Sequence, residues 1–319
     1  METTGCVADS AGSAGNPWPY RLAVLTAAAT FLLILVGGVV TNTGTGMAVP
    51  DWPTTFGYNM FLYPWSKMVG GVLYEHTHRL LGSLVGSLTL ALAVVLWAVE
   101  PRQSVRVLGI AALAAVVLQG VLGGLRVVLA ADTLAIVHGA FAHVFFAAVA
   151  AIALFTSPSW RAAVPVVHSA AALRLRRLGV ATTVALYGQI LLGALVTHRG
   201  TRLDAHLVGA ALVSAAVIAV GFCLAPGRAD WPELVRPAET LGALWLLQLL
   251  LALGAYVARF HAADIPLVPG LALAFPVSHR LTAGLMLIAS LVLTLRTCRR
   301  TGWLGSDPRR STLSPRTVA

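Results

Sequence analysis

Four histidines lie near the same end of four separate hydrophobic segments in this chain. They are His78, His138, His206 and His279. An imidazole is costly inside a lipid bilayer and needs a partner or a function there. Two imidazoles that converge between helices could ligate the iron of a porphyrin from its two faces. The chain order therefore predicts two haem sites, with these ligand pairs: His78 with His138, and His206 with His279.

A glutamate precedes the first of these histidines by one helical turn. Glu75 and His78 are three residues apart, so their side chains share one face of a helix. A carboxylate beside a haem could move a proton, position a water molecule or stabilise positive charge on a substrate. An ion pair between Glu75 and Arg79, four residues later, is the alternative interpretation. We expect Glu75 to be catalytic.

Three arginines lie close to the expected sites. Arg79 and Arg280 each follow a candidate ligand directly, and Arg126 closes another hydrophobic segment. Guanidinium groups bind carboxylates such as haem propionates, so we expect these side chains to bind the porphyrins. Contact with lipid phosphate would explain each position equally well. On the fourth hydrophobic segment, His143 is a rival to His138 as ligand, although it lies off the same face and about one turn deeper.

Eight hydrophobic runs are long enough, at about 20 residues each, to cross a bilayer. The chain is 58% hydrophobic and only 11% charged, which is too apolar for a soluble domain of 319 residues. Continuous apolar runs indicate helices rather than a barrel. We therefore expect an all-α integral membrane protein with eight transmembrane helices. The runs lie near residues 21–40, 72–98, 105–125, 133–155, 178–197, 204–225, 238–258 and 275–296.

The placement of the basic residues explains the net charge of +10 without a nucleic-acid partner. With eight spans, most Lys and Arg residues fall on the side of the two termini. The more basic side of a membrane protein is normally cytoplasmic. We expect a multi-pass protein of the inner (plasma) membrane with both termini in the cytoplasm. The excess positive charge also suits anionic membrane lipid.

Two sequence frames recur in the two halves of the chain. G-x-x-V-T-x-x-G-T begins at Gly37 and at Gly193, and Q-x-x-L-G begins at Gln119 and at Gln189. Short connections make successive helices antiparallel neighbours. We expect two pseudo-symmetric four-helix bundles joined by a basic linker. The predicted divisions are a disordered tail at 1–20, an N-terminal half at 21–157, a linker at 158–177, a C-terminal half at 178–298 and a tail at 299–319.

The chain resembles the haem A synthase family of eight-span membrane enzymes over about residues 20 to 298. The E-x-x-H-R motif at Glu75, His78 and Arg79 is the strongest element of the resemblance. The other elements are the frame that begins at Gly37, the Q-x-x-L-G-G segment at 119–124, His138, His206 and Ser278-His279-Arg280. Some members of the family carry a cysteine pair in an outer loop, and this chain has none.

The resemblance implies oxidation of the C8 methyl of haem O to a formyl group, giving haem A for terminal oxidases. It implies a substrate haem between His78 and His138, a haem b cofactor between His206 and His279, and catalysis by Glu75. The expected partners are haem O, membrane lipid, an unidentified electron carrier, haem O synthase and a second copy of the chain. Both an attack by water on a carbocation-like species and oxygen activation at the iron fit this sequence.

Two other classes of protein share some of these features. A non-catalytic di-haem b membrane cytochrome that passes electrons from quinol would use the same four histidines. It would have no need of Glu75. A haem or small-molecule transporter is the third class. Inverted repeats are common in transporters, but four helices per half would give both halves the same orientation in the membrane.

Overall fold

The computed structural model describes residues 16–303, and these residues form helices with no β-strand. Eight of the helices are long and apolar enough to cross a membrane, which confirms the predicted all-α membrane class. The expected tails fall largely outside the described residues, at 1–15 and 304–319. The long helices are α1 (Trp18–Asn42), α2 (Gly71–Val99), α3 (Gln103–Val128), α4 (Asp132–Thr156), α6 (Ala170–Arg199), α7 (Leu203–Leu224), α8 (Pro232–Phe260) and α9 (Pro269–Arg300). The short elements are α5 (Pro158–Arg161) and the 3₁₀ turns η1 (Met60–Leu62), η2 (Trp65–Lys67) and η3 (Ala225–Gly227).

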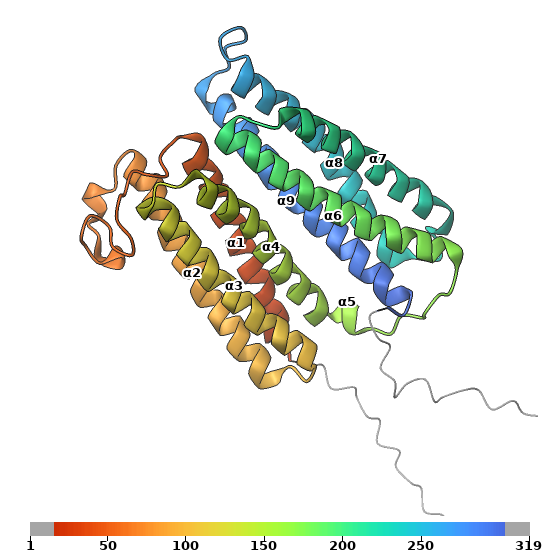
Figure 1. The fold of residues 1–319 in the computed structure, drawn as a ribbon. Coiled ribbons are helices and arrows are strands. Elements are labelled where there is room, and N and C mark those ends of the chain that lie inside the picture. Colours follow the sequence, from red (N-terminus) through yellow and green to blue (C-terminus); the bar gives the residue numbers. More distant parts are fainter. Residues whose placement is uncertain (1–15, 304–319) are drawn as a thin grey trace, which may run out of the picture.

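The helices form two groups of four that lie side by side (Figure 1). In the first group α1 contacts α2, α2 contacts α3, α3 contacts α4, and α4 returns to α1. The second group closes in the same way from α6 through α9. The groups meet where α1 and α4 pack against α6 and α9. We call the end at which α2, α4, α7 and α9 begin the histidine end, and the opposite end the terminal end. The pseudo-symmetry between the groups stays a prediction.

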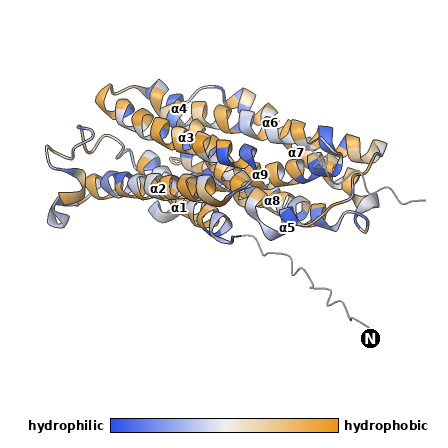
Figure 2. Ribbon diagram, turned by 90° about the horizontal axis from the view of Figure 1, so that it is seen from below, coloured by the Kyte–Doolittle hydropathy of each residue, from blue (hydrophilic) through white to orange (hydrophobic). Residues whose placement is uncertain are grey.

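Apolar side chains cover the outside of the helices as well as the inside. Hydrophobic residues follow most of each helix, while hydrophilic residues gather mostly towards helix ends and loops (Figure 2). Leu250 on α8 is 69% exposed and Phe222 on α7 is 76% exposed. Water would not tolerate so continuous an apolar exterior, whereas lipid does. Inside the first group, buried residues such as Leu92 and Ile152 form the core.

Three helices begin at least six residues earlier than hydropathy predicted. α6 begins at Ala170 instead of 178, inside the segment expected to be a linker, and that segment also contains α5. The Ser169 side chain accepts a hydrogen bond from the Ala172 N–H and so caps α6. α8 and α9 start with Pro232 and Pro269, whose fixed φ suits the first turn of a helix. Hydropathy misses the extensions of α6 and α8 because they contain charged residues, whereas the extension of α9 is apolar and is set by Pro269.

Candidate functional site

The first expected histidine pair comes together between α2 and α4. The ring centres of His78 and His138 are 6.4 Å apart, with an angle of 77° between the ring planes. Each ring lies against a glycine of a neighbouring helix. A Cβ added at Gly37 or at Gly123 would lie 2.9 Å from the Cε1 of His78 or His138, respectively. Only glycine leaves room for these two imidazoles in their present positions.

The second pair repeats this geometry between α7 and α9. The ring centres of His206 and His279 are also 6.4 Å apart, at an interplanar angle of 73°. A Cβ added at Gly193 on α6 would lie 3.2 Å from His206 Cε1. The structure therefore brings together both pairs that the sequence predicted, and it gives both the same separation.

This separation suits one metal ion between the two imidazoles of a pair. Metal–nitrogen bonds of roughly 2 Å place two ring centres about 6 Å apart. Among the described residues, no group of three or more His, Cys, Asp or Glu side chains could hold a bare ion. The iron of a porphyrin brings four of its own ligands, so two imidazoles at this separation would suit it.

Two further features at the pairs fit a flat ligand. Gly82 and Gly86 follow His78 at intervals of four residues, so they lie on the same face of α2. A Cβ added at either glycine would have no atom within 4 Å, so the space in front of this face is open. The Nδ1 atoms of His78, His206 and His279 are buried and have no hydrogen-bond partner within residues 16–303. The rings of His78 and His206 are thus positioned by packing, and the His279 ring also by Gln248, whose Nε2 lies 3.4 Å from His279 Nε2. The three Nδ1 atoms keep donor or acceptor capacity.

Glutamines hold the main chain at one histidine of each pair. Gln119 Nε2 donates to the His138 carbonyl at 2.8 Å, and Gln189 Nε2 donates to the His206 carbonyl at 2.7 Å. The His138 ring returns the contact, with Nδ1 3.2 Å from the Gln119 carbonyl oxygen. These contacts were not predicted, although the Q-x-x-L-G frame was their signal. It puts glutamine and glycine one turn apart, where both reach the same histidine.

Glu75 is buried, with 4% of the residue exposed, and both of its carboxylate oxygens have partners. Oε2 accepts a hydrogen bond from the Val49 N–H at 2.9 Å, and Oε1 pairs with Arg79 Nη2 at 2.9 Å. The ion pair considered as an alternative role is therefore present. The residues at the equivalent place before the other three histidines carry no carboxylate; they are Ala135, Leu203 and Pro276.

Arg79 uses its remaining contacts to hold the loop that connects α1 to α2. Its Nη1 donates to the carbonyls of Asp51 at 2.7 Å and Thr54 at 2.9 Å, and Nη2 also donates to the Val49 carbonyl at 2.9 Å. With both terminal nitrogens bound to the protein, this arginine has little left to offer a propionate. The contacts favour a role in positioning Glu75 and the loop.

The same loop, residues 43–70, covers the histidine end of the first group. Trp52 packs its indole ring directly on Gly124 of α3. His76, one residue after Glu75 and 1% exposed, holds the loop from below because its Nδ1 lies 3.1 Å from Thr55 Oγ1. His76 therefore anchors the loop and lies off the helix face that carries His78. The second group has only residues 200–202 and 261–268 at its histidine end.

Asp51 stabilises this loop from within. Burial alone would raise the pKa of the Asp51 carboxyl group, but hydrogen bonds from Gly57 N–H, Thr54 Oγ1 and Phe56 N–H lower the pKa to about 2. The Phe56 and Gly57 backbones have positive φ angles of 50° and 78°, which turn both N–H groups towards the carboxylate.

Arg126 and Arg280 differ from Arg79 in having donors left for a ligand. Arg126 Nη2 donates to the Gly46 carbonyl at 2.9 Å, and its charge acts on Glu75 and His78. The Arg280 guanidinium makes no hydrogen bond or ion pair with any other residue from 16 to 303, although its charge acts on His279. An anion placed beside either histidine pair would find one of these guanidinium groups nearby.

His143 faces away from the first pair. Its Nδ1 lies 2.9 Å from the Gly139 carbonyl oxygen of its own helix, and its ring packs against Gly284 of α9. An added Cβ at Gly284 would lie 3.1 Å from the His143 Cδ2. The imidazole that meets His78 is that of His138, so His143 belongs to the contact between the two groups of helices.

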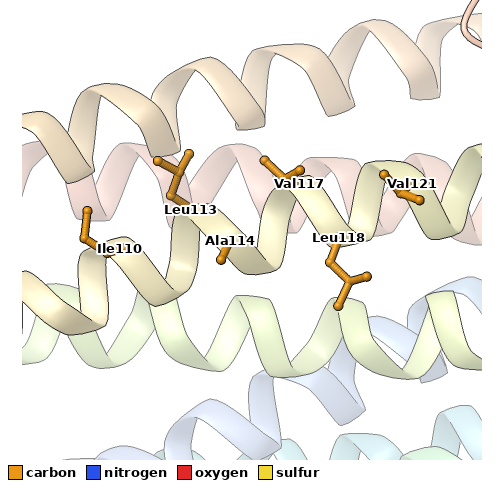
Figure 3. A pocket seen from close by; sticks show the side chains of 6 residues that line it. All are labelled: Ile110, Leu113, Ala114, Val117, Leu118 and Val121. Carbon is orange, nitrogen blue, oxygen red and sulfur yellow. The ribbon is translucent and has the colours of Figure 1, made fainter.

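The grooves on the surface lie away from the histidines. One groove of about 500 Å³ runs along α3 and is lined by apolar side chains that face the surroundings of the helix (Figure 3). The lining residues are Ile110, Leu113, Ala114, Val117, Leu118 and Val121. None of them could perform acid–base, metal or redox chemistry, so we assign no reaction to this groove.

Comparison with known proteins places the chain in a family. The model of the cytochrome oxidase assembly protein family matches residues 20–203. A protein named Heme A synthase from Shouchella clausii (strain KSM-K16) is 29% identical over 188 residues, which are 57% of this chain and 60% of that protein. A protein of the same name from Alkalihalophilus pseudofirmus (strain ATCC BAA-2126 / JCM 17055 / OF4) is 30% identical over 107 residues, 33% of this chain and 35% of that protein. The chain thus matches less than two thirds of either relative's length. With more than half of its residues matched by the family model, the chain belongs to the cytochrome oxidase assembly protein family.

Proposed function

We propose that this protein is a haem A synthase, which oxidises the C8 methyl of haem O to a formyl group. The observation that carries the proposal is an asymmetry between two otherwise equal histidine pairs. Both pairs have ring centres 6.4 Å apart, but only the pair at His78 has a buried carboxylate one turn away. The names of the two relatives support the same reaction.

The two pairs would take different porphyrins. We assign the substrate haem O to His78 and His138, beneath the 43–70 loop and beside Glu75. We assign a resident haem b to His206 and His279, where no acid or base stands at the position that corresponds to Glu75. Conversion of a methyl to a formyl group with oxygen from water releases four electrons and four protons. A bound haem b would supply one-electron redox chemistry for passing these electrons to the proposed electron carrier. The halves at 21–157 and 178–298 would then be a substrate half and a cofactor half.

Glu75 is the residue that we assign to the reaction. Held between Val49 N–H and Arg79, its carboxylate has a fixed direction and remains an acceptor. Such a group stabilises positive charge that develops on a substrate carbon, and it can take the proton of an attacking water molecule. Burial strengthens both effects because few water molecules compete with the carboxylate. The loop would keep bulk solvent away from the reacting methyl group, so that water reaches that group only beside Glu75.

The arginines would orient the porphyrins. Arg126 and Arg280 have donors available beside the first and second pair, so we assign the haem propionates to them. Arg79 would position Glu75 instead. We place the histidine end outside the cytoplasm and both termini inside, in the inner (plasma) membrane. Haem O synthase, an electron carrier and a second copy of the chain are the proposed partners.

A conversion assay tests the proposed function. The chain is expressed in a host that makes haem O but no haem A, and the extracted pigments are separated by chromatography. We expect haem A with the unchanged chain and haem O alone with Glu75→Gln. The matched control is Glu100→Gln, because Glu100 is equally buried and paired with Arg102, but lies at the terminal end.

The outcomes separate the enzyme from the other classes of protein. Haem A in the unchanged and Glu100→Gln chains, but not in Glu75→Gln, supports the proposal. Persistent haem O with a folded chain that carries two permanently bound b haems would identify a di-haem membrane cytochrome. Full conversion by Glu75→Gln would remove Glu75 from the mechanism and leave the reaction itself in place.

A further inference from the structure

The second group of helices has a groove at the terminal end, far from the histidine pairs along the helices. It has a volume of about 980 Å³ and lies between the first turns of α6, the last turns of α7 and the start of α8. Its lining residues are Ala171, Arg174, Arg177, Leu178, Ala181, Phe222, Cys223, Pro226, Gly227, Asp230 and Trp231. The proposed reaction uses none of them.

The groove combines an apolar floor with a cationic edge. Ala171, Leu178 and Ala181 recur along one face of α6, and Phe222 of α7, 76% exposed, forms the opposite apolar wall. Arg174 lies on the same face as Ala171 and Leu178 and is exposed. The floor therefore continues from the helix end into the part of α6 that spans the membrane.

Two guanidinium groups at the edge are free to bind an anion. Arg174 and Arg177 are one turn apart on α6, and neither makes a hydrogen bond or an ion pair within the described part of the chain. They lie in the second and third turns of α6, at the terminal end of that helix. Asp230 stands across the groove, so an anion would bind on the α6 side.

We propose that this groove binds one anionic phospholipid. Its phosphate lies between Arg174 and Arg177, and its acyl chains follow Leu178, Ala181 and Phe222 along the membrane-spanning part of α6 and α7. Basic grooves between helices at a membrane surface suit this class of ligand. The groove on α3 in Figure 3 provides the contrast, since it is apolar throughout and has no cation for a headgroup. This binding is independent of the proposed haem chemistry.

Spin-labelled lipids test the proposal on the full chain in vesicles of phosphatidylcholine. The measurement is the fraction of label immobilised by the protein, for labelled phosphatidylglycerol and labelled phosphatidylcholine. The unchanged chain should prefer phosphatidylglycerol, and each of Arg174→Gln and Arg177→Gln should weaken that preference roughly fivefold. The double control Arg21→Gln/Arg236→Gln changes two other exposed arginines of the terminal end outside the groove and should keep the preference.

A second pair of variants separates the groove from general surface charge. Ala181→Trp fills the apolar floor without changing any charge, and it should abolish the preference. Ala114→Trp makes the same change in the α3 groove and should leave the preference as it is. Equal losses in Ala181→Trp and Ala114→Trp would overturn the proposal. So would a loss in the Arg21→Gln/Arg236→Gln control as large as in Arg174→Gln or Arg177→Gln. The proposal would also be overturned if millimolar inorganic phosphate removed the preference for phosphatidylglycerol and Ala181→Trp did not change it. That result would indicate a site for free phosphate.

Discussion

The two helix groups hold equivalent histidine pairs but differ in what surrounds them. Glycines stand behind the rings in both, and a glutamine holds the main chain of one histidine in each. Only the first group adds a buried glutamate, an arginine that fixes it, and a long covering loop. Under the proposed function, the imidazole pair alone holds a porphyrin, and the additions at the first pair serve the reaction.

Replacing single candidate histidine ligands should have the largest effect, and the effect should differ between the two pairs. His206→Ala or His279→Ala should lose the resident haem, because one axial ligand is gone and its partner ring cannot replace it. His78→Ala should keep the resident haem and lose conversion of haem O. The measurement is the absorption spectrum of the purified protein together with pigment analysis.

The exposed His168, in the segment between the groups, is the matched control for these ligand variants. His168→Ala should change neither the spectrum nor conversion. If His78→Ala and His206→Ala lost the same amount of resident haem, the division into a substrate pair and a cofactor pair would be wrong.

The sequence predicted the helices and the pairing because both follow from simple periodicities. Hydropathy identifies any span of about 20 apolar residues, and a polar residue such as His78 stands out within it. The helix ends at Ala170 and Pro269 were missed because capping and proline at the first turn, not hydropathy, determine them.

Other features depend on how the helices rotate against one another. Gln119 donates to the carbonyl of His138, and Arg79 donates to three loop carbonyls. Both contacts depend on how the helices and the loop are arranged in space, which residue spacing along the chain does not determine. The sequence left both an ion pair and a propionate open for Arg79. The contacts favour the ion pair.

Arg79→Lys should have the second-largest effect, and it should lower conversion at the first pair without affecting the second pair. A lysine keeps the charge but cannot make the four hydrogen bonds to Glu75 and the loop carbonyls. We expect conversion to fall roughly 10- to 100-fold, as when groups that orient a reactive residue are removed. Resident haem content, measured by absorption, should stay the same.

The control for this substitution is Arg199→Lys, which alters one hydrogen bond, to Thr133, at the same end of the molecule. It should leave conversion within about twofold, in keeping with the small contribution of exposed polar contacts. A loss of resident haem in Arg79→Lys would mean that this arginine serves the second pair as well.

Replacing the glycines that contact the histidine rings with alanine should weaken haem binding by a smaller amount, which depends on how close the added Cβ lies to the ring. Gly123→Ala places a Cβ 2.9 Å from the His138 ring, whereas Gly193→Ala places one at 3.2 Å from the His206 ring. We expect roughly tenfold weaker haem O binding from Gly123→Ala, and a smaller loss of resident haem from Gly193→Ala. Haem titration of the purified variants measures both.

Gly120→Ala and Gly188→Ala are the matched controls for the two glycine variants. Each lies on the same helix as its counterpart, and an added Cβ there would meet no atom within 4 Å. Both should bind haem normally. If the controls lost as much haem binding as the test variants, the cause would be the change in the helix backbone and not contact between the added Cβ and the rings.

The smallest expected effect concerns the pH dependence of the 43–70 loop, which the second group lacks. The folded pKa of Asp51, about 2, lies below its ordinary value of 3.8, so the ionised carboxylate favours the folded loop. This stabilisation is fully present above pH 3.8 and is lost as the pH falls towards 2. Protection of the loop from an acid-active protease should decline over that range, and Asp51→Asn should already be less protected at neutral pH, when assayed with a neutral protease.

Asp264→Asn, in the loop of the second group, should leave the profile unchanged, because that carboxylate contacts only the exposed His261 ring, at 3.3 Å. The same acid profile with and without Asp51 would show that another group governs the loop, and the contrast between the two coverings would then rest on Arg79 and Trp52 alone.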